Sequence, residues 1–182
     1  VVEYVNNLKF DEDDISYLRS KGYFDEEFLQ YYARTMTQMR QPFMTAVFTA
    51  SSHHPFRVPK QYEGVFPKGT QPIHQCIGYT DHALRAFFAY ARTQDWYQNT
   101  LFVLTADHTN QVSFPEYATA KGVFEVPIAF YSPRWNQGHL HAQSAVSQTD
   151  IMPSVLAYLG YTQPFVAFGE NALTKDKKHP YV

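Results

Sequence analysis

The sequence predicts an α/β fold in which helices flank a mainly parallel sheet. Two observations support this class. Stretches with apolar side chains at helical spacing alternate along the chain with short apolar runs, and these runs are nearly continuous and rich in β-branched and aromatic residues. Continuous apolar runs are typical of strands that are covered on both faces, as in parallel sheets. The chain has 182 residues, of which 45% are apolar, so we expect one domain with one sizeable core.

The first helix is expected over residues 25–40 and the first strand over residues 43–50. Asp25 is expected to cap the helix, and apolar side chains then recur at helical spacing at Phe28, Tyr32, Met36 and Met39. Pro42 ends this helix, and the run that follows is almost wholly apolar and β-prone. Residues 51–70 contain several prolines and glycines, so they predict an irregular loop that is long enough to indicate a function.

A second helix is expected from Pro72 onwards, with one apolar face made by Ile73, Ile77, Thr80, Leu84, Phe87 and Ala91. Two further buried strands are expected over residues 100–105 and 126–131. The last helix is expected over residues 151–159, with Asp150 as its N-cap and Gly160 placed to end it.

Composition limits the classes of partner. The formal net charge of -2 and the absence of a long basic run argue against nucleic acid as a partner. Aromatic residues make up 17% of the chain, which favours an aromatic core over a sugar- or lipid-binding surface. Cys76 is the only cysteine, so neither an intrachain disulfide nor a cysteine metal site is expected. No apolar run approaches the roughly 20 residues that a membrane-spanning helix needs.

Histidines follow two of the predicted strands. His53 and His54 come after residues 43–50, and Asp107 and His108 come directly after residues 100–105. Parallel sheets place their sites at the carboxyl ends of strands, and a carboxylate beside an imidazole suits a divalent cation. The alternative for a lone Asp-His pair is a hydrogen-bonded aspartate beside an exposed histidine.

Four segments in order carry a family resemblance. Residues 99–110 (NTLFVLTADHTN) resemble the strand and Asp-His element of the sulfatase-like branch of the alkaline phosphatase superfamily, near lipoteichoic acid synthase and related phosphoglycerol transferases. The other three segments are residues 41–56, 79–84 and 148–156, with Phe168-Gly169 beyond them. The resemblance implies an alkaline phosphatase-like three-layer sandwich, of which residues 1–182 would be the C-terminal portion of one catalytic domain, incomplete at both ends.

The resemblance also implies roles for single residues. Asp107 and His108 match the family's metal pair, and His53 matches its phosphate-contacting histidine; His54 stands where an apolar residue is usual. No segment matches the element that carries the nucleophile, so we expect little turnover from this stretch of chain alone. Manganese is the expected cation, with magnesium, zinc and calcium also compatible with these ligands.

The implied function is that of a metal-dependent phosphoglycerol or phosphoethanolamine transferase, acting on phosphodiesters of lipid or envelope glycan. The whole protein would work outside the cytoplasm, anchored by membrane helices. Two alternatives stay open: a sulfuric ester hydrolase, and a non-catalytic carbohydrate- or lipid-binding domain. The oligomeric state is left open.

Other polar residues are weaker candidates for the site. We expect Asp150 to act as a cap rather than a ligand, and Asp81 to hydrogen-bond a neighbouring loop. His139 and His141 alternate in a polar loop, where exposed histidines without a ligand are the commoner case.

Overall fold

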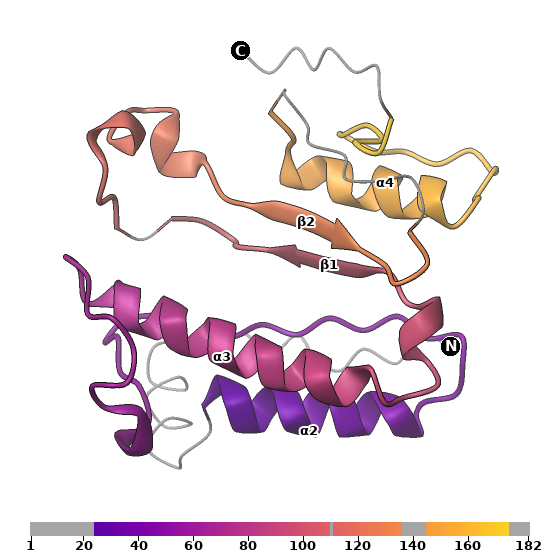
Figure 1. Ribbon diagram of the computed structural model, residues 1–182. Coiled ribbons are helices and arrows are strands. Elements are labelled where there is room, and N and C mark those ends of the chain that lie inside the picture. Colours follow the sequence, from indigo (N-terminus) through magenta and orange to yellow (C-terminus); the bar gives the residue numbers. More distant parts are fainter. Residues whose placement is uncertain (1–23, 110, 136–144, 175–182) are drawn as a thin grey trace. The chain divides into compact units, whose positions relative to one another are not determined.

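A computed structural model describes residues 24–109, 111–135 and 145–174. They form two compact units, each with its own elements (Figure 1). The first unit comprises the chain up to Thr100 together with His108–Glu125, and it contains helices α2 and α3. The second comprises Leu101–Asp107 together with the chain from Val126 onwards, and it contains strands β1 and β2 and helix α4. The expectation that residues 1–182 belong to one domain stays a prediction.

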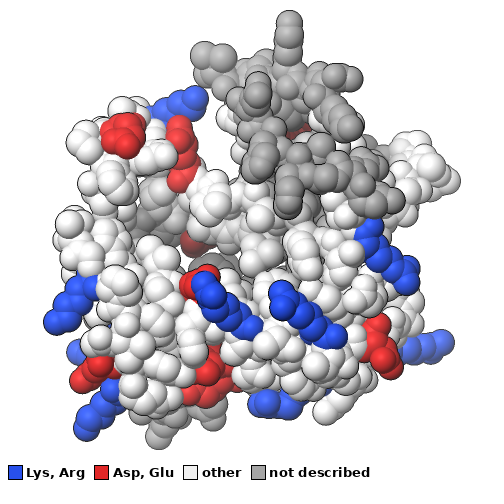
Figure 2. Space-filling view, viewed as in Figure 1, with Lys and Arg blue, Asp and Glu red and all other residues white. Residues whose placement is uncertain are grey.

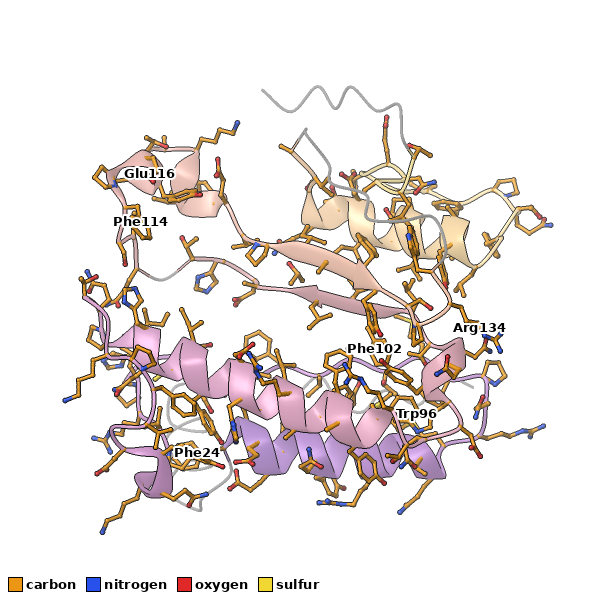
Figure 3. All side chains as sticks on the ribbon, viewed as in Figure 1. Phe24, Trp96, Phe102, Phe114, Glu116 and Arg134 are labelled. Atoms are coloured by element: carbon orange, nitrogen blue, oxygen red, sulfur yellow. The ribbon has the colours of Figure 1, made fainter. Side chains whose placement is uncertain are left out.

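The core of the first unit lies between α2 (Asp25–Gln38) and α3 (Ile73–Ala91). The buried side chains of α2 recur at helical spacing, as the sequence predicts for an amphipathic helix. Tyr32 of α2 stacks on Phe87 of α3, with 6.1 Å between the ring centroids. Trp96, which is labelled in Figure 3, follows the end of α3. Its Nε1–H donates a hydrogen bond to Thr37 Oγ1 at 3.0 Å. The core residues from both helices are Leu29, Tyr32, Ala33, Met36, Cys76, Tyr79, Ala83, Phe87 and Ala91.

The buried face of α3 differs from the predicted one in its first half. Cys76, Tyr79 and Ala83 are fully buried, whereas Ile77 is 53% exposed. The Tyr79 ring meets Phe24 edge to face at 6.2 Å, and its hydroxyl accepts a hydrogen bond from the Glu26 N–H at 3.1 Å. Burial of this large ring with its polar tip satisfied therefore outweighs burial of the aliphatic Ile77 side chain.

The second unit contains a two-stranded sheet and one helix. Strands β1 (Phe102–Thr105) and β2 (Ile128–Tyr131) pair antiparallel, with Phe102 opposite Tyr131 and Thr105 opposite Ile128. Phe102 and Tyr131 also stack, with 5.9 Å between their centroids. Helix α4 (Ile151–Tyr158) follows the short 3₁₀ turn η5 (Gln148–Asp150), and Gly160 adopts a left-handed φ of 70° just beyond it, as its predicted role in ending the helix requires.

The predicted direction of the strands needs correction. The sheet was predicted to be mainly parallel, but its two described strands are antiparallel. A parallel pair needs a long crossover, usually an α-helix, and the described part of the β1–β2 connection carries only the 3₁₀ turns η3 (Pro115–Tyr117) and η4 (Gly122–Phe124). The three-layer sandwich stays a prediction.

Residues 43–50 form no strand, contrary to the prediction. Met44 and Phe48 are 71% and 58% exposed. A β-prone run becomes a strand only when a neighbouring strand accepts and donates its backbone hydrogen bonds. The described sheet contains β1 and β2 alone, and neither pairs with this run. Among the described residues, no helix is long and apolar enough to cross a bilayer.

Candidate functional site

The loop that carries His53 is a compact turn. The His53 N–H donates to the Ala50 carbonyl, and the Phe56 N–H donates to the His53 carbonyl, both at 3.1 Å. Phe56 is buried and adopts a φ of 55°, the left-handed region that a bulky residue rarely occupies. Such residues concentrate in functional loops, where the surrounding structure holds them in place.

A buried carboxylate fixes the start of this loop. Asp25 is 3% exposed, and its Oδ1 accepts hydrogen bonds from the backbone N–H groups of Ala50 at 2.9 Å and Ser51 at 3.0 Å. Its Oδ2 accepts from Thr80 Oγ1 at 3.0 Å. Phe24 occupies the N-cap position of α2, so the prediction that Asp25 caps this helix is wrong. Asp25 instead joins α2, α3 and the backbone that leads into His53.

The geometry of the His53 ring defines its tautomer. Nδ1 lies 2.8 Å from the His54 carbonyl oxygen. A carbonyl only accepts hydrogen bonds, so Nδ1 carries a proton and the neutral ring has its lone pair on Nε2. His53 is half-buried, whereas His54 is exposed.

Asp107 and His108 follow β1 directly, and both side chains are exposed. His108 repeats the arrangement of His53: its Nδ1 lies 2.8 Å from the carbonyl oxygen of the next residue, Thr109. The neutral ring therefore also has its lone pair on Nε2, which is the tautomer that metal-ligating histidines commonly use when a carbonyl holds the other nitrogen.

Gln148, in the 3₁₀ turn η5 just before α4, hydrogen-bonds to the backbone at the end of β1. Gln148 Nε2 donates to the carbonyls of Ala106 at 2.6 Å and Asp107 at 3.0 Å. These bonds join residues that are 41 and 42 positions apart in the sequence, so no local pattern could have identified Gln148 as a positioning residue.

The donor set of Asp107 and His108 fits a divalent cation in its chemistry. A carboxylate oxygen and an imidazole nitrogen suit manganese, magnesium or zinc. Two side chains are fewer than such a site needs, and the described residues contain no group of three or more His, Cys, Asp or Glu side chains that could hold a metal ion. Between Asp107 and His108 the chain passes from the second unit to the first. The approach of His53 to this pair stays a prediction.

Asp150 has a structural role, and its side chain is fully buried. It occupies the N-cap position of α4, as predicted, but its side chain makes no cap hydrogen bond to that helix. It closes a capping box with Ser147 instead, accepting from the Ser147 N–H at 3.0 Å, and it also accepts from the Glu170 N–H at 2.6 Å.

The other weak candidates have different outcomes. Asp81 is exposed and pairs with Arg85 one turn along α3 at 2.9 Å, rather than with a neighbouring loop. His139 and His141 lie outside the described residues. His74 and His82, which the sequence did not single out, both hydrogen-bond to distant side chains: His74 Nε2 to Ser113 Oγ at 3.0 Å, and His82 Nε2 to the Tyr62 hydroxyl at 3.1 Å.

Comparison with known proteins identifies the family. A sequence-family model described as Sulfatase matches residues 2–161. The chain is 24% identical to the lipoteichoic acid synthase-like protein YvgJ of Bacillus subtilis, over 92% of this chain and 31% of that protein. It is 25% identical to lipoteichoic acid synthase 1 of the same organism, over 85% of this chain and 27% of that protein. The chain thus spans about a third or less of the length of these relatives.

A solved structure shows the same fold. It is a protein of the alkaline phosphatase superfamily from Vibrio parahaemolyticus, with a TM-score of 0.56 and 24% identity, and the match covers 75% of this chain and 34% of that one. This likeness supports the predicted α/β class. The chain belongs to the sulfatase family, in the sulfatase-like branch of the alkaline phosphatase superfamily near the lipoteichoic acid synthases.

Proposed function

We propose that this chain is part of a metal-dependent phosphoglycerol or phosphoethanolamine transferase that acts on phosphodiesters of lipid or envelope glycan. The observation that carries this proposal is the adjacent Asp107 and His108 at the end of β1, in a chain whose relatives include lipoteichoic acid synthases. The backbone beneath the pair is held by Gln148, and the His108 tautomer leaves Nε2 as its basic nitrogen.

Asp107 and His108 would hold the cation, for which manganese is our first choice and magnesium, zinc or calcium the alternatives. When bound, the cation would lower the pKa of the attacking hydroxyl and offset charge on the phosphoryl oxygens. The attacking group would come from a part of the family domain that this chain does not match. In the first step the attacking oxygen would bond to phosphorus as the bond to the lipid or glycerol oxygen breaks, and the leaving oxygen would take up the proton lost by the attacking hydroxyl. In the second step an acceptor hydroxyl or water would attack phosphorus, displace the enzyme's oxygen and return a proton to it.

His53 would contact a non-bridging oxygen of the phosphate. Its Nδ1–H already donates to the His54 carbonyl, so a second donation from Nε2 requires the ring to carry both protons. Removal of one such donor costs on the order of 100-fold in rate.

Asp107→Ala in the complete protein tests the metal assignment. We expect manganese affinity, measured by isothermal titration calorimetry, to fall at least about tenfold, because a direct ligand is lost. Asp81→Ala is the matched control, since Asp81 is an exposed aspartate that pairs with Arg85 on its own helix. Equal manganese affinity in the Asp107→Ala variant and the wild type would refute the assignment.

The second candidate function is sulfate ester hydrolysis, which the family match favours because it carries the description Sulfatase. Turnover of the complete protein on a phosphodiester and on a sulfate ester separates the two. Ligand binding without turnover, unchanged by a chelator, would instead indicate a non-catalytic binding domain. We place the whole protein in the cell envelope with a membrane anchor, to be checked by fractionation of cells that produce it.

A further inference from the structure

An open cleft of about 850 Å³ lies in the first unit, beside the loop that carries His53. Its lining begins at Phe56 and continues through Arg57 and Val58, the residues that follow the His53 turn directly. The rest of the lining comes from Glu63 and Gly64 and from the segment 68–72 that leads into α3, with Gln75 of the first turn of that helix. The volume lies within the range of about 300–1,000 Å³ that is usual for small-molecule sites.

The charge of this cleft is opposite in sign to that of the whole chain. Arg57 and Lys68 line it together with one acidic residue, Glu63, whereas the chain as a whole has a net charge of -2. Within the described residues, neither Arg57 nor Lys68 forms an ion pair. Figure 2 shows basic and acidic side chains interspersed over the visible face, without a broad basic surface on that side.

Neutral hydrogen-bonding groups complete the lining. Thr70, Gln71 and Gln75 contribute a hydroxyl and two amides. Pro72 stands at the N-cap position of α3, and no side chain caps this helix. The positive end of the helix dipole therefore adds to the attraction of Arg57 and Lys68 for an anion.

The segment next to α3 packs closely against His74. Gly69 adopts a left-handed φ of 59°, and a Cβ there would lie 2.0 Å from His74 Nδ1. The Thr70 N–H donates to this same Nδ1 at 3.1 Å, so Nε2 carries the proton and donates to Ser113 Oγ. A preformed wall lowers the entropy cost of binding a ligand.

We propose that this cleft binds a phosphate or sulfate group on a polyol or sugar, in the part of the substrate that adjoins the reacting ester. Two cations suit one anionic group, and the hydroxyl and amide side chains suit the hydroxyls beside it. The proposed function enters this inference at one point: it identifies the bound group as part of the substrate whose phosphate His53 would contact. Two cations beside one carboxylate are too few for a nucleic acid backbone.

Binding of sn-glycerol 3-phosphate to the complete protein, measured by calorimetry in the presence of a chelator, tests the cleft separately from the metal pair. We expect Arg57→Gln and Lys68→Gln each to weaken binding about fivefold to tenfold, because each loses one charge-assisted contact. Glu63→Gln should strengthen it about twofold to fivefold, because a like charge is removed. A misfolded variant could not produce that gain.

Lys60→Gln is the matched control, since Lys60 is exposed but does not line the cleft. It should leave the affinity unchanged. Equal affinities in the Arg57→Gln, Lys68→Gln and Lys60→Gln variants would overturn the proposal, as would binding of glycerol as tight as that of its phosphate. If the cleft variants behave as expected while the complete protein turns over no ester, the proposed function fails and the cleft stands.

A soluble short-chain phosphatidylglycerol and a sulfated disaccharide then identify the source of the anionic group. Tighter binding of the lipid than of glycerol phosphate would assign the cleft to a lipid headgroup. Tighter binding of the disaccharide would assign it to a glycan. If neither probe competes with glycerol phosphate, the cleft does not bind a substrate of either kind, and the inference is wrong.

Discussion

Asp25→Ala should destabilise the first unit and loosen the loop that carries His53. The carboxylate accepts hydrogen bonds from the backbone N–H groups of Ala50 and Ser51 and from the Thr80 hydroxyl, at 2.9 to 3.0 Å. A buried donor that loses its partner costs about 1–3 kcal/mol. Ser51 is buried and Ala50 is half-buried, so water replaces only part of what is lost. We expect the free energy of unfolding to fall by about 2–4 kcal/mol.

Asp25→Asn should cost less, about 1 kcal/mol, because one oxygen remains to accept from both backbone donors while the charge is lost. The matched control is Asp81→Asn on α3, where the aspartate is 62% exposed and pairs with Arg85. Removal of that pair should change the free energy of unfolding by less than about 0.5 kcal/mol.

Urea unfolding of the three variants gives the free energies, and hydrogen exchange of the Ala50 and Ser51 amides reports the loop itself. These amides should exchange faster in Asp25→Ala than in Asp81→Asn. If Asp25→Ala were as stable as Asp81→Asn, or if the two amides kept their protection, the idea that Asp25 holds this loop would be refuted.

Two further predictions concern the same unit. Gly69→Ala should destabilise the protein more than Gly64→Ala, by about 1 kcal/mol or more in urea unfolding. Both glycines have a positive φ, but a Cβ at Gly69 meets His74, whereas one at Gly64 meets nothing within 4 Å; equal losses would contradict the close approach. Burial raises the pKa of Tyr79 above its ordinary 10.0, and the nearby acidic residues add to the rise. The folded state therefore keeps a proton that the unfolded state loses, so stability is complete below about pH 10 and declines as the pH rises further. Tyr79→Phe should make the free energy of unfolding fall less steeply with pH. If its slope between about pH 9 and 11 were the same in the variant and the wild type, Tyr79 would not be the cause of the decline.

The periodicity of apolar residues predicted the helices well, because each helix forms its backbone hydrogen bonds within itself. Helices α2, α3 and α4 all occur within the ranges expected from the sequence. Strand prediction was less successful. The sequence placed β1 and β2 correctly, yet the equally apolar residues 43–50 form no strand. A strand depends on a neighbour elsewhere in the chain, and composition does not show whether that neighbour is in place.

For the candidate site too, the sequence identified some residues and missed others. Asp107 and His108 were identified because an apolar, β-prone run that ends in a carboxylate and an imidazole is visible in a few consecutive residues. The residues that hold the site were not identified from sequence. Asp25 was interpreted as a helix cap, but its carboxylate accepts from backbone groups 25 and 26 residues away. Gln148 drew no interpretation of its own, and the carbonyls that it holds are 41 and 42 residues away.

The sequence by itself determined the α/β class, the positions of the helices, the family resemblance and the residues proposed to hold the cation. Only the tertiary structure decided the buried face of α3, the antiparallel pairing of β1 and β2, and the cleft beside the His53 loop. The physical reason is the range of the interactions. Helix periodicity and strand-end motifs act over a few residues, whereas a strand's pairing partner or a buried carboxylate's donors come from segments that only folding brings together.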